Sequence, residues 1–348
     1  MTAPTLKSIA RATGFSITTV SRALGGYDDV SEETRRLILE EAQRQGYAPN
    51  LNARLLQGQR TQTIGLIIPA SGPRVPDQFF SEFVAGVSHQ AAAAGYDLLL
   101  STSAQPSADT GPYRRLVSRG RVDGLVLART SRDDARIAYL LETTTPFVVF
   151  GRTAFDGFPY IDVDGVAGQC ALTEHFIALG HRRIAYICPP AHLMFAEYRL
   201  EGFRAAMQRH NIPLDPSLIV HGDLTEKSGR ELAHHLLSLP HPPTAIMAGN
   251  DLMAFGVMSA VQAHGLRVGD DVAVGGFDDV PLAEYIHPGL TTIRQPIYEI
   301  GERLTEMLLR MLAGDTLTER AVLLKPELIV RASSGPPRVS QETREKGA

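Results

Sequence analysis

The chain has 348 residues, of which 44% are hydrophobic and 21% are charged, values typical of a soluble globular protein with two or three domains. Its apolar runs are too short to cross a bilayer and its first residues lack the apolar stretch of a signal peptide, which predicts a cytoplasmic protein without membrane contact. A net charge of −4 argues against a generic nucleic-acid binder, yet residues 1–60 carry eight Lys or Arg against six Asp or Glu. A mildly basic head on an acidic body is typical of a protein that contacts phosphate at one end only.

Residues 5–24 predict two short helices joined by a tight turn. Thr5 is placed to cap the first helix, whose apolar residues recur at helical spacing, and Gly14 ends it with a residue that accepts positive φ. Ser16 begins the second helix, whose face opposite the apolar stripe presents Ile17, Thr18, Ser21 and Arg22. This pattern is typical of a helix-turn-helix whose second helix enters the DNA major groove, although an ordinary helical hairpin has the same spacing.

A third helix is predicted from Ser31 to Gln45, where Ser31 is a good N-cap and Gly46 follows the last turn. Pro49 and Asn50 then interrupt the chain. Residues 51–57 are compatible with a helix, but two turns of helix are marginal in water without a partner.

From residue 63 the pattern changes to buried strands that alternate with helices. Strands are predicted at 64–68, 96–100, 125–128, 147–150, 184–188, 219–221, 245–248, 272–276 and 322–330, the last of which is interrupted by Pro326. Helices are predicted at 79–94, 111–118, 133–142, 165–179, 199–210, 229–239, 253–264 and 304–312. This alternation predicts parallel α/β sheets in two lobes, with a ligand cleft at the carboxyl ends of the strands. The polar tail lacks a leucine heptad, so no coiled-coil element is expected.

Several short motifs follow one another in a specific order and spacing. They are Thr-Leu-Lys-Ser-Ile-Ala at 5–10, Thr-Thr-Val-Ser-Arg at 18–22, Gly-Tyr-Ala-Pro-Asn at 46–50, Ala-Arg-Leu-Leu at 53–56, Leu-Gly-His-Arg-Arg-Ile-Ala at 179–185, Arg-Leu-Glu-Gly-Phe at 199–203, Gly-Asn-Asp at 249–251 and Gly-Phe-Asp-Asp at 276–279. With these motifs the chain resembles the lactose-repressor/galactose-repressor (LacI/GalR) family of bacterial transcriptional regulators over nearly its full length. The resemblance implies a regulator, expected to be a repressor, that binds a palindromic operator as a homodimer and responds to a small-molecule effector.

The resemblance also implies a division into domains. It places an all-α helix-turn-helix DNA-binding domain at 1–49, a hinge helix and linker at 50–62, a periplasmic-binding-protein-like core for effector binding and dimerisation at 63–332, and a disordered tail at 333–348. Within the core, the N lobe would comprise about 63–162 and 292–321, and the C lobe about 163–291 and 322–332.

The resemblance implies three kinds of DNA contact in the head and hinge. Base edges would be read by Ile17, Thr18 and Arg22, and Arg22 suits a bidentate contact to guanine. Phosphates would be contacted by Thr5, Ser16, Thr19, Ser21, Ser31, Thr34 and Asn50. Ala53 and Leu56 would enter the minor groove, where an apolar wedge kinks the duplex. The plainer alternatives are that Ser21 and Thr34 are ordinary polar residues of a helix surface and that Leu56 packs against the head.

For the effector, the resemblance and the strand ends point to seven residues of the cleft: Phe79, Phe80, Arg152, Arg199, Leu224, Asn250 and Asp278. Arg199 would open a helix and bind two vicinal hydroxyls or a carboxylate. Asn250 offers both a donor and an acceptor and Asp278 accepts from hydroxyls, so that the set suits a neutral polyol. Leu224 stands where many relatives carry an aromatic residue. The absence of an aromatic ring at this position would widen the pocket, enough for a disaccharide. Phe80 could equally be a core residue, and helix capping is the preferred interpretation of Asp251 and Asp279.

The leading hypothesis is therefore a transcriptional regulator controlled by a small carbohydrate. A purine or other non-sugar effector is an alternative within the same class, and a solute-binding protein of a transporter is an alternative from another class. The sequence contains no nucleophile elbow, P-loop or dinucleotide fingerprint, so no catalytic residue and no cofactor are expected. Cys170, Cys188 and the histidines lack metal-ligand spacing, which predicts no metal site.

Overall fold

A computed structural model of the protein describes residues 4–47, 60–69, 78–103 and 109–336. The N-terminal head consists of helices α1 (Leu6–Thr13), α2 (Ile17–Leu24) and α3 (Glu32–Gln45). Each helix begins after a hydroxyl N-cap, Thr5, Ser16 or Ser31, whose side chain accepts a hydrogen bond from the amide three residues later. Gly14 ends α1 at a φ of 77°, which a residue without a Cβ adopts readily. A small apolar core holds the three helices together.

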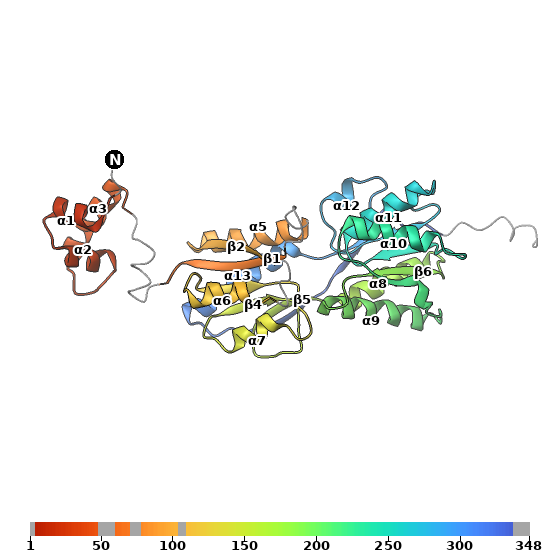
Figure 1. Cartoon of the computed structure of the whole chain (residues 1–348), viewed down its shortest axis with the longest axis horizontal. Coiled ribbons are helices and arrows are strands. Elements are labelled where there is room, and N and C mark those ends of the chain that lie inside the picture. The colour runs from red at the N-terminus through yellow and green to blue at the C-terminus, as the bar shows by residue number, and fades with distance from the viewer. Residues whose placement is uncertain (1–3, 48–59, 70–77, 104–108, 337–348) are drawn as a thin grey trace, which may run out of the picture.

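The N lobe is built on a six-stranded parallel sheet with the order β11-β5-β4-β3-β1-β2. Its strands are β1 (Thr63–Pro69), β2 (Asp97–Ser103), β3 (Gly124–Leu127), β4 (Phe147–Phe150), β5 (Tyr160–Val163) and β11 (Ala321–Leu324). Its helices are α5 (Gln78–Ala93), α6 (Gly111–Ser118), α7 (Ala135–Leu141) and α13 (Ile297–Ala313). Helices α5 and α13 cover one face of the sheet, and α6 and α7 cover the other (Figure 1). Because both faces are covered, the central strands are apolar throughout.

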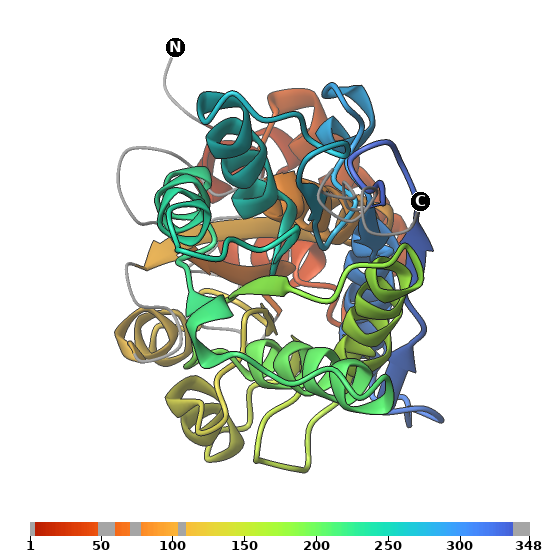
Figure 2. The same ribbon diagram turned by 90° about the vertical axis from the view of Figure 1, so that its right-hand side faces the viewer.

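The C lobe repeats this architecture on a four-stranded parallel sheet with the order β7-β6-β8-β9. Its strands are β6 (Ile184–Cys188), β7 (Ile219–His221), β8 (Ala245–Ala248) and β9 (Ala273–Gly275). Its helices are α8 (Gly165–Ala178), α9 (Met194–Arg209), α10 (Glu226–Leu237), α11 (Asp251–Ala263) and the short α12 (Leu282–Tyr285), with a 3-10 turn at Pro216–Leu218. Helices α8 and α9 lie on one face of the sheet and α10 and α11 on the other (Figure 2).

Three chain crossings connect the lobes, and they differ from the predicted division. The chain passes from β5 to α8, from β10 (Thr292–Arg294) to α13, and from β11 to β12 (Glu327–Ile329), and β10 pairs antiparallel with β12. The strand predicted at 322–330 is therefore two strands in different sheets, because Pro326 between them has no amide to continue a ladder. Residues 322–324 belong to the N-lobe sheet, whereas Ile293 packs in the C-lobe core, the reverse of the predicted assignment.

The predicted disordered tail also begins too early. Ser333 is fully buried, and its hydroxyl donates to Val274 O at 2.7 Å and accepts from Thr291 N at 2.7 Å. These bonds attach Ser333 to the edge strand β9 and to the segment before β10, so the start of the predicted tail is part of the C lobe. Residues 337–348 lie outside the described residues. No helix among the described residues is both long and apolar enough to span a bilayer.

Candidate functional site

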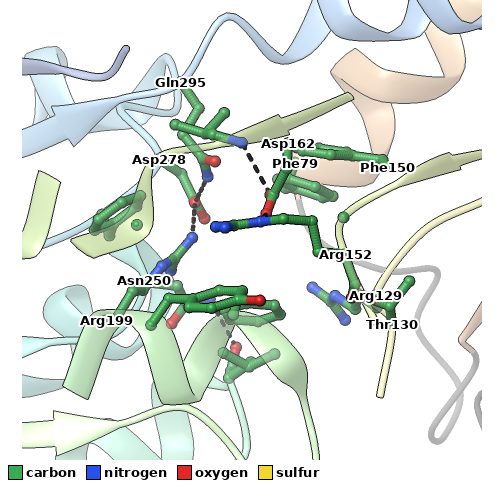
Figure 3. Close-up of a pocket in the computed structure, with 17 residues that line it drawn as sticks. Phe79, Arg129, Thr130, Phe150, Arg152, Asp162, Arg199, Asn250, Asp278 and Gln295 are labelled. Carbon is green, nitrogen blue, oxygen red and sulfur yellow. Dashed lines mark hydrogen bonds and ion pairs between the residues drawn. The ribbon is translucent and has the colours of Figure 1, made fainter. Parts of the chain in front are cut away.

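A pocket lies between the two lobes, at the carboxyl ends of both sheets, and six of the seven predicted effector residues line it (Figure 3). Those six are Phe79, Arg152, Arg199, Leu224, Asn250 and Asp278. The lining also includes Arg129, Thr130, Phe150, Gly151, Asp162, Val163, Gly165, Phe195, Tyr198, Phe277 and Gln295. Charged groups of both signs thus face aromatic rings in one cleft, an arrangement typical of a small-molecule site.

Arg199 is the most deeply buried cation of the pocket, with 5% of its surface exposed. Its guanidinium lies 3.5 Å from the centre of the Phe277 ring, and its Nη2 is 3.9 Å from Asp278 Oδ1. It also donates to the Gly249 carbonyl. Burial lowers the pKa of Arg199, and Asp278 counters this effect. Arg199 lies in the second turn of α9 and does not open a helix as predicted, because α9 already begins at Met194.

Asp278 faces Arg199 from a backbone position that is unusual for a residue with a side chain. Its φ is 131°, and Gln295 Nε2 donates to its Oδ1 at 2.6 Å. Such outliers cost free energy and concentrate at functional sites. The strained backbone therefore supports a binding role for this carboxylate.

Arg152 reaches into the pocket from the end of β4 and touches both lobes. Its Nε donates to Asp162 Oδ2 at 2.7 Å, and its guanidinium lies 3.8 Å from the ring centre of Tyr198 on α9. Burial raises the pKa of Asp162, and Arg152 opposes that shift. Within the part of the chain that the structure describes, Arg152 Nη2 and Arg199 Nε are buried donors without a hydrogen-bond partner.

Asn250 and Leu224 are joined to each other at the pocket wall. Asn250 caps α11 by accepting from Met253 N at 3.0 Å, and its Nδ2 donates to Leu224 O at 3.2 Å. Leu224 adopts a φ of 72°, so this bond fixes a strained turn at the pocket. The Asn250 side chain is therefore partly committed to holding the turn.

The two adjacent phenylalanines separate into different roles. Phe79 lines the pocket and stacks on Phe150 with ring centres 5.7 Å apart. Phe80 is 2% exposed and belongs to the N-lobe core, so its prediction as an effector residue is wrong. In α5 the two rings point in different directions because consecutive residues of a helix are about 100° apart.

Asp251 and Asp279 do not cap helices, contrary to the sequence-based interpretation. Asp251 is fully buried, accepts from Thr292 Oγ1 at 2.6 Å and Val280 N at 2.9 Å, and has a pKa that burial raises to about 6. Asp279 accepts from Arg294 and Arg331, each at 2.7 Å. Both carboxylates therefore tie the segments next to the lobe crossings together.

Sequence reasoning missed several pocket residues, and Asp162 shows why. It lies in β5, a four-residue strand that was not predicted because a charged residue interrupts its apolar pattern. Phe195 and Tyr198 were missed with the first turns of α9, whose N-cap Leu193 has no side chain that can cap a helix. The sequence signal that could have identified them is the pair of aromatic residues at helical spacing, 195 and 198, directly before Arg199.

The histidines and cysteines do not form a metal site in the described ranges. His234 Nδ1 and His264 Nε2 are 2.9 Å apart on the outer helices of the C lobe, and both cysteines are buried and reduced. Two histidines without a carboxylate or thiolate beside them are too few for the four-ligand sites that zinc prefers.

The head presents the predicted DNA-contacting residues on one side of α2 and at helix N-termini. Ile17 is 43% exposed, and Arg22 is ion-paired with Asp29 at 2.5 Å while its guanidinium lies over the Tyr27 ring. Ser16 Oγ lies 2.8 Å from Thr19 Oγ1, and Ser31 Oγ donates to Thr34 Oγ1 at 2.9 Å, so these hydroxyls gather at the starts of α2 and α3. Helix N-termini of this kind suit phosphate oxygens. The predicted Asn50, Ala53 and Leu56 lie outside the described residues.

Comparisons with known proteins agree with this architecture. A family model described as "Bacterial regulatory proteins, lacI family" matches residues 5–50, and one described as "Periplasmic binding protein-like domain" matches residues 173–334. The HTH-type transcriptional regulator AglR of Rhizobium meliloti (strain 1021) is 35% identical over 336 residues, covering 95% of this chain and 94% of that protein.

Two solved structures show the same fold with ligands. The lac repressor dimer bound to operator and the anti-inducer ONPF is 27% identical at a TM-score of 0.81, over 96% of this chain and 100% of that one. The complex of the transcriptional regulator CelR with cellobiose is 31% identical at a TM-score of 0.72, over 95% and 99%. The predicted combination of a helix-turn-helix head and an α/β core with parallel sheets is confirmed. The chain belongs to the LacI family of bacterial transcriptional regulators.

Proposed function

We propose that this protein is a cytoplasmic transcriptional repressor that binds a palindromic operator as a homodimer and is controlled by a small carbohydrate. The basic head supplies Arg22 and Ile17 for base edges and the hydroxyls of α2 and α3 for phosphates. The solved lac repressor dimer on its operator supports this arrangement. The predicted hinge helix would complete the DNA contact in the minor groove.

The pocket between the lobes is the observation that carries the effector assignment. Arg152 Nη2 and Arg199 Nε are buried donors without a partner among the described residues, and ligand hydroxyl oxygens can accept from both. The half-buried rings of Phe79 and Tyr198 line the pocket and offer apolar surface to the C–H groups of a sugar ring. The CelR–cellobiose complex, a relative with a bound sugar, supports a carbohydrate in this cleft.

The test is a thermal-shift screen of the full chain against neutral sugars, disaccharides and nucleosides, followed by calorimetric titration of the ligand that raises Tm most. A ligand at a hundredfold its Kd adds about 2.7 kcal/mol of stability. We expect a sugar to bind and Arg199→Ala to weaken it by roughly ten- to hundredfold, since hydrogen bonds to charged groups contribute about 1.5–3 kcal/mol.

Arg209→Ala is the matched control, because Arg209 lies on the same helix with its side chain 61% exposed and pairs with Glu174 away from the pocket. Its affinity for the sugar should equal that of the wild type. Binding of a nucleoside without any response to sugars would replace the carbohydrate by a purine-type effector. If both substitutions weaken sugar binding equally, Arg199 does not contact the effector.

A further inference from the structure

A short loop of the N lobe reaches across the cleft and touches the start of α9 in the C lobe. Residues 129–132 follow β3, and Thr130 O accepts a hydrogen bond from Met194 N at 2.8 Å. Ser131 forms an isolated antiparallel bridge with Leu193. These main-chain contacts join the lobes at a place remote in sequence from all three chain crossings.

Side chains extend the same contact along one face of α9. Arg132 is ion-paired with Glu197 one turn into the helix, with 57% and 51% of the two side chains exposed. Arg152 lies on the ring of Tyr198, the next residue. Positions 194, 197 and 198 share one side of a helix, so the N lobe contacts one side of α9 along its first two turns.

The loop is held in this conformation from within its own lobe. Arg136 is completely buried and donates to Ala128 O at 3.2 Å and Arg129 O at 3.1 Å. Asp134, ion-paired with Arg136 at 2.7 Å, accepts from Ser131 N at 3.1 Å. Both charges are fully buried, so breaking this network would leave an uncompensated charge in the core. The loop is therefore preformed for contact with α9 and does not need α9 to order it.

The contact also satisfies the first amide of α9. Met194 is the first residue of the helix, so its amide has no acceptor within the helix. The N-lobe carbonyl of Thr130 accepts from this amide. Separation of the lobes would expose this amide to water, and the same helix carries Tyr198 and Arg199 into the pocket.

We propose that residues 129–132 form a clasp that holds the two lobes together beside the pocket, and that the Arg132–Glu197 pair sets how often the lobes separate there. Entry and release of the effector would then require the Thr130–Met194 bond to break. The role in effector exchange rests on the proposed function, whereas the clasp itself can be measured without any ligand.

Hydrogen exchange of the Met194 amide in the full-length, ligand-free protein tests the clasp, read at single-residue resolution. Glu197→Arg or Arg132→Glu places like charges together and should speed this exchange by roughly 1.5- to fivefold, the range that corresponds to the free energy of an exposed ion pair. The double variant Arg132→Glu/Glu197→Arg restores opposite charges and should return the rate towards that of the wild type. A loss of folding would not be rescued in this way.

Two controls isolate the effect. Arg209→Glu disrupts an ion pair within the C lobe and should leave Met194 unchanged, and the Met253 amide, capped by Asn250 in its own lobe, should exchange alike in all variants. Equal Met194 rates in the wild type and both single variants would overturn the proposal. So would exchange of Met194 only at the rate of the buried β6 amides, because the lobes would then separate only on unfolding. If no sugar binds in the thermal-shift screen, the proposed effector is contradicted but the clasp is not. If the exchange rate of Met194 is unchanged in the variants, the clasp is contradicted but the sugar pocket is not.

Discussion

Burial of Asp251 couples a single ionisation to the stability of the C lobe. Its pKa of about 6 lies above the value of 3.8 that it has in an unfolded chain, so the folded state binds a proton more tightly. A raised pKa contributes stability that is fully present below about pH 4 and is lost as the pH rises through 6.

We therefore expect the free energy of unfolding of the wild type, relative to Asp251→Asn, to fall between pH 4 and pH 6 and to stay level above pH 6. Urea denaturation at a series of pH values measures this difference. A difference that stays level from pH 4 to pH 6 and falls only below pH 4 would show that the hydrogen bonds from Thr292 and Val280 outweigh burial and hold the carboxylate ionised.

If Arg22 reads a base as proposed, it exchanges one partner for another when the head binds DNA. In the free protein its guanidinium pairs with Asp29 and covers Tyr27, and it would leave Asp29 to reach guanine. Arg22→Ala should cost about 1–3 kcal/mol of operator affinity and relax specificity at one base position.

Gel-shift titrations with a palindromic duplex recovered by in vitro selection, and with its single-base variants, measure this effect. Arg36→Ala on α3 is the control, because Arg36 pairs with Glu40 on the helix surface. Equal weakening on every base variant would restrict Arg22 to a phosphate contact.

The contact between α8 and α9 depends on one glycine. A Cβ on Gly202 would lie 2.3 Å from Val166 O, so the two helix backbones approach one another more closely than a side chain allows. Gly to Ala in a free helix stabilises it by up to about 1 kcal/mol, but overpacking here should destabilise the C lobe by about 1–3 kcal/mol. Thermal unfolding of Gly202→Ala measures whether the substitution lowers or raises Tm. We expect a lower Tm, and a raised Tm would show that α9 can move away from α8 without a cost in stability.

Long apolar elements could be predicted from the sequence, and elements defined by tertiary contact could not. Ile64–Ile68 and Phe147–Phe150 are recognisable as buried strands because both faces of the sheet are covered. The first turns of α9 could not be predicted because no capping side chain precedes them and their first amide bonds to a carbonyl of the other lobe. Strand β5 could not be predicted because Asp162 interrupts its apolar pattern. Site residues could be predicted where a strand end coincides with a family motif, as at Asn250 and Asp278. Residues that contact them from the other lobe, such as Tyr198 beside Arg152, could not be predicted.

The whole molecule combines a DNA-binding head with a cleft whose two lobes are linked by three chain crossings and by the proposed clasp of residues 129–132. If the effector changes operator affinity by some factor, the operator must change effector affinity by the same factor, because the two binding reactions form a closed thermodynamic cycle. Typical coupling is about 1–3 kcal/mol, or roughly five- to 150-fold.

The most direct test is calorimetric titration of the full chain with the sugar that raises its Tm, with and without a saturating amount of the selected operator duplex. We expect the Kd of the sugar to differ at least fivefold between the free protein and the operator complex, and the same sugar to change the Kd of the operator by an equal factor in the same direction. A sugar that binds with the same Kd in the presence and absence of operator would contradict control of this regulator through the pocket between its lobes.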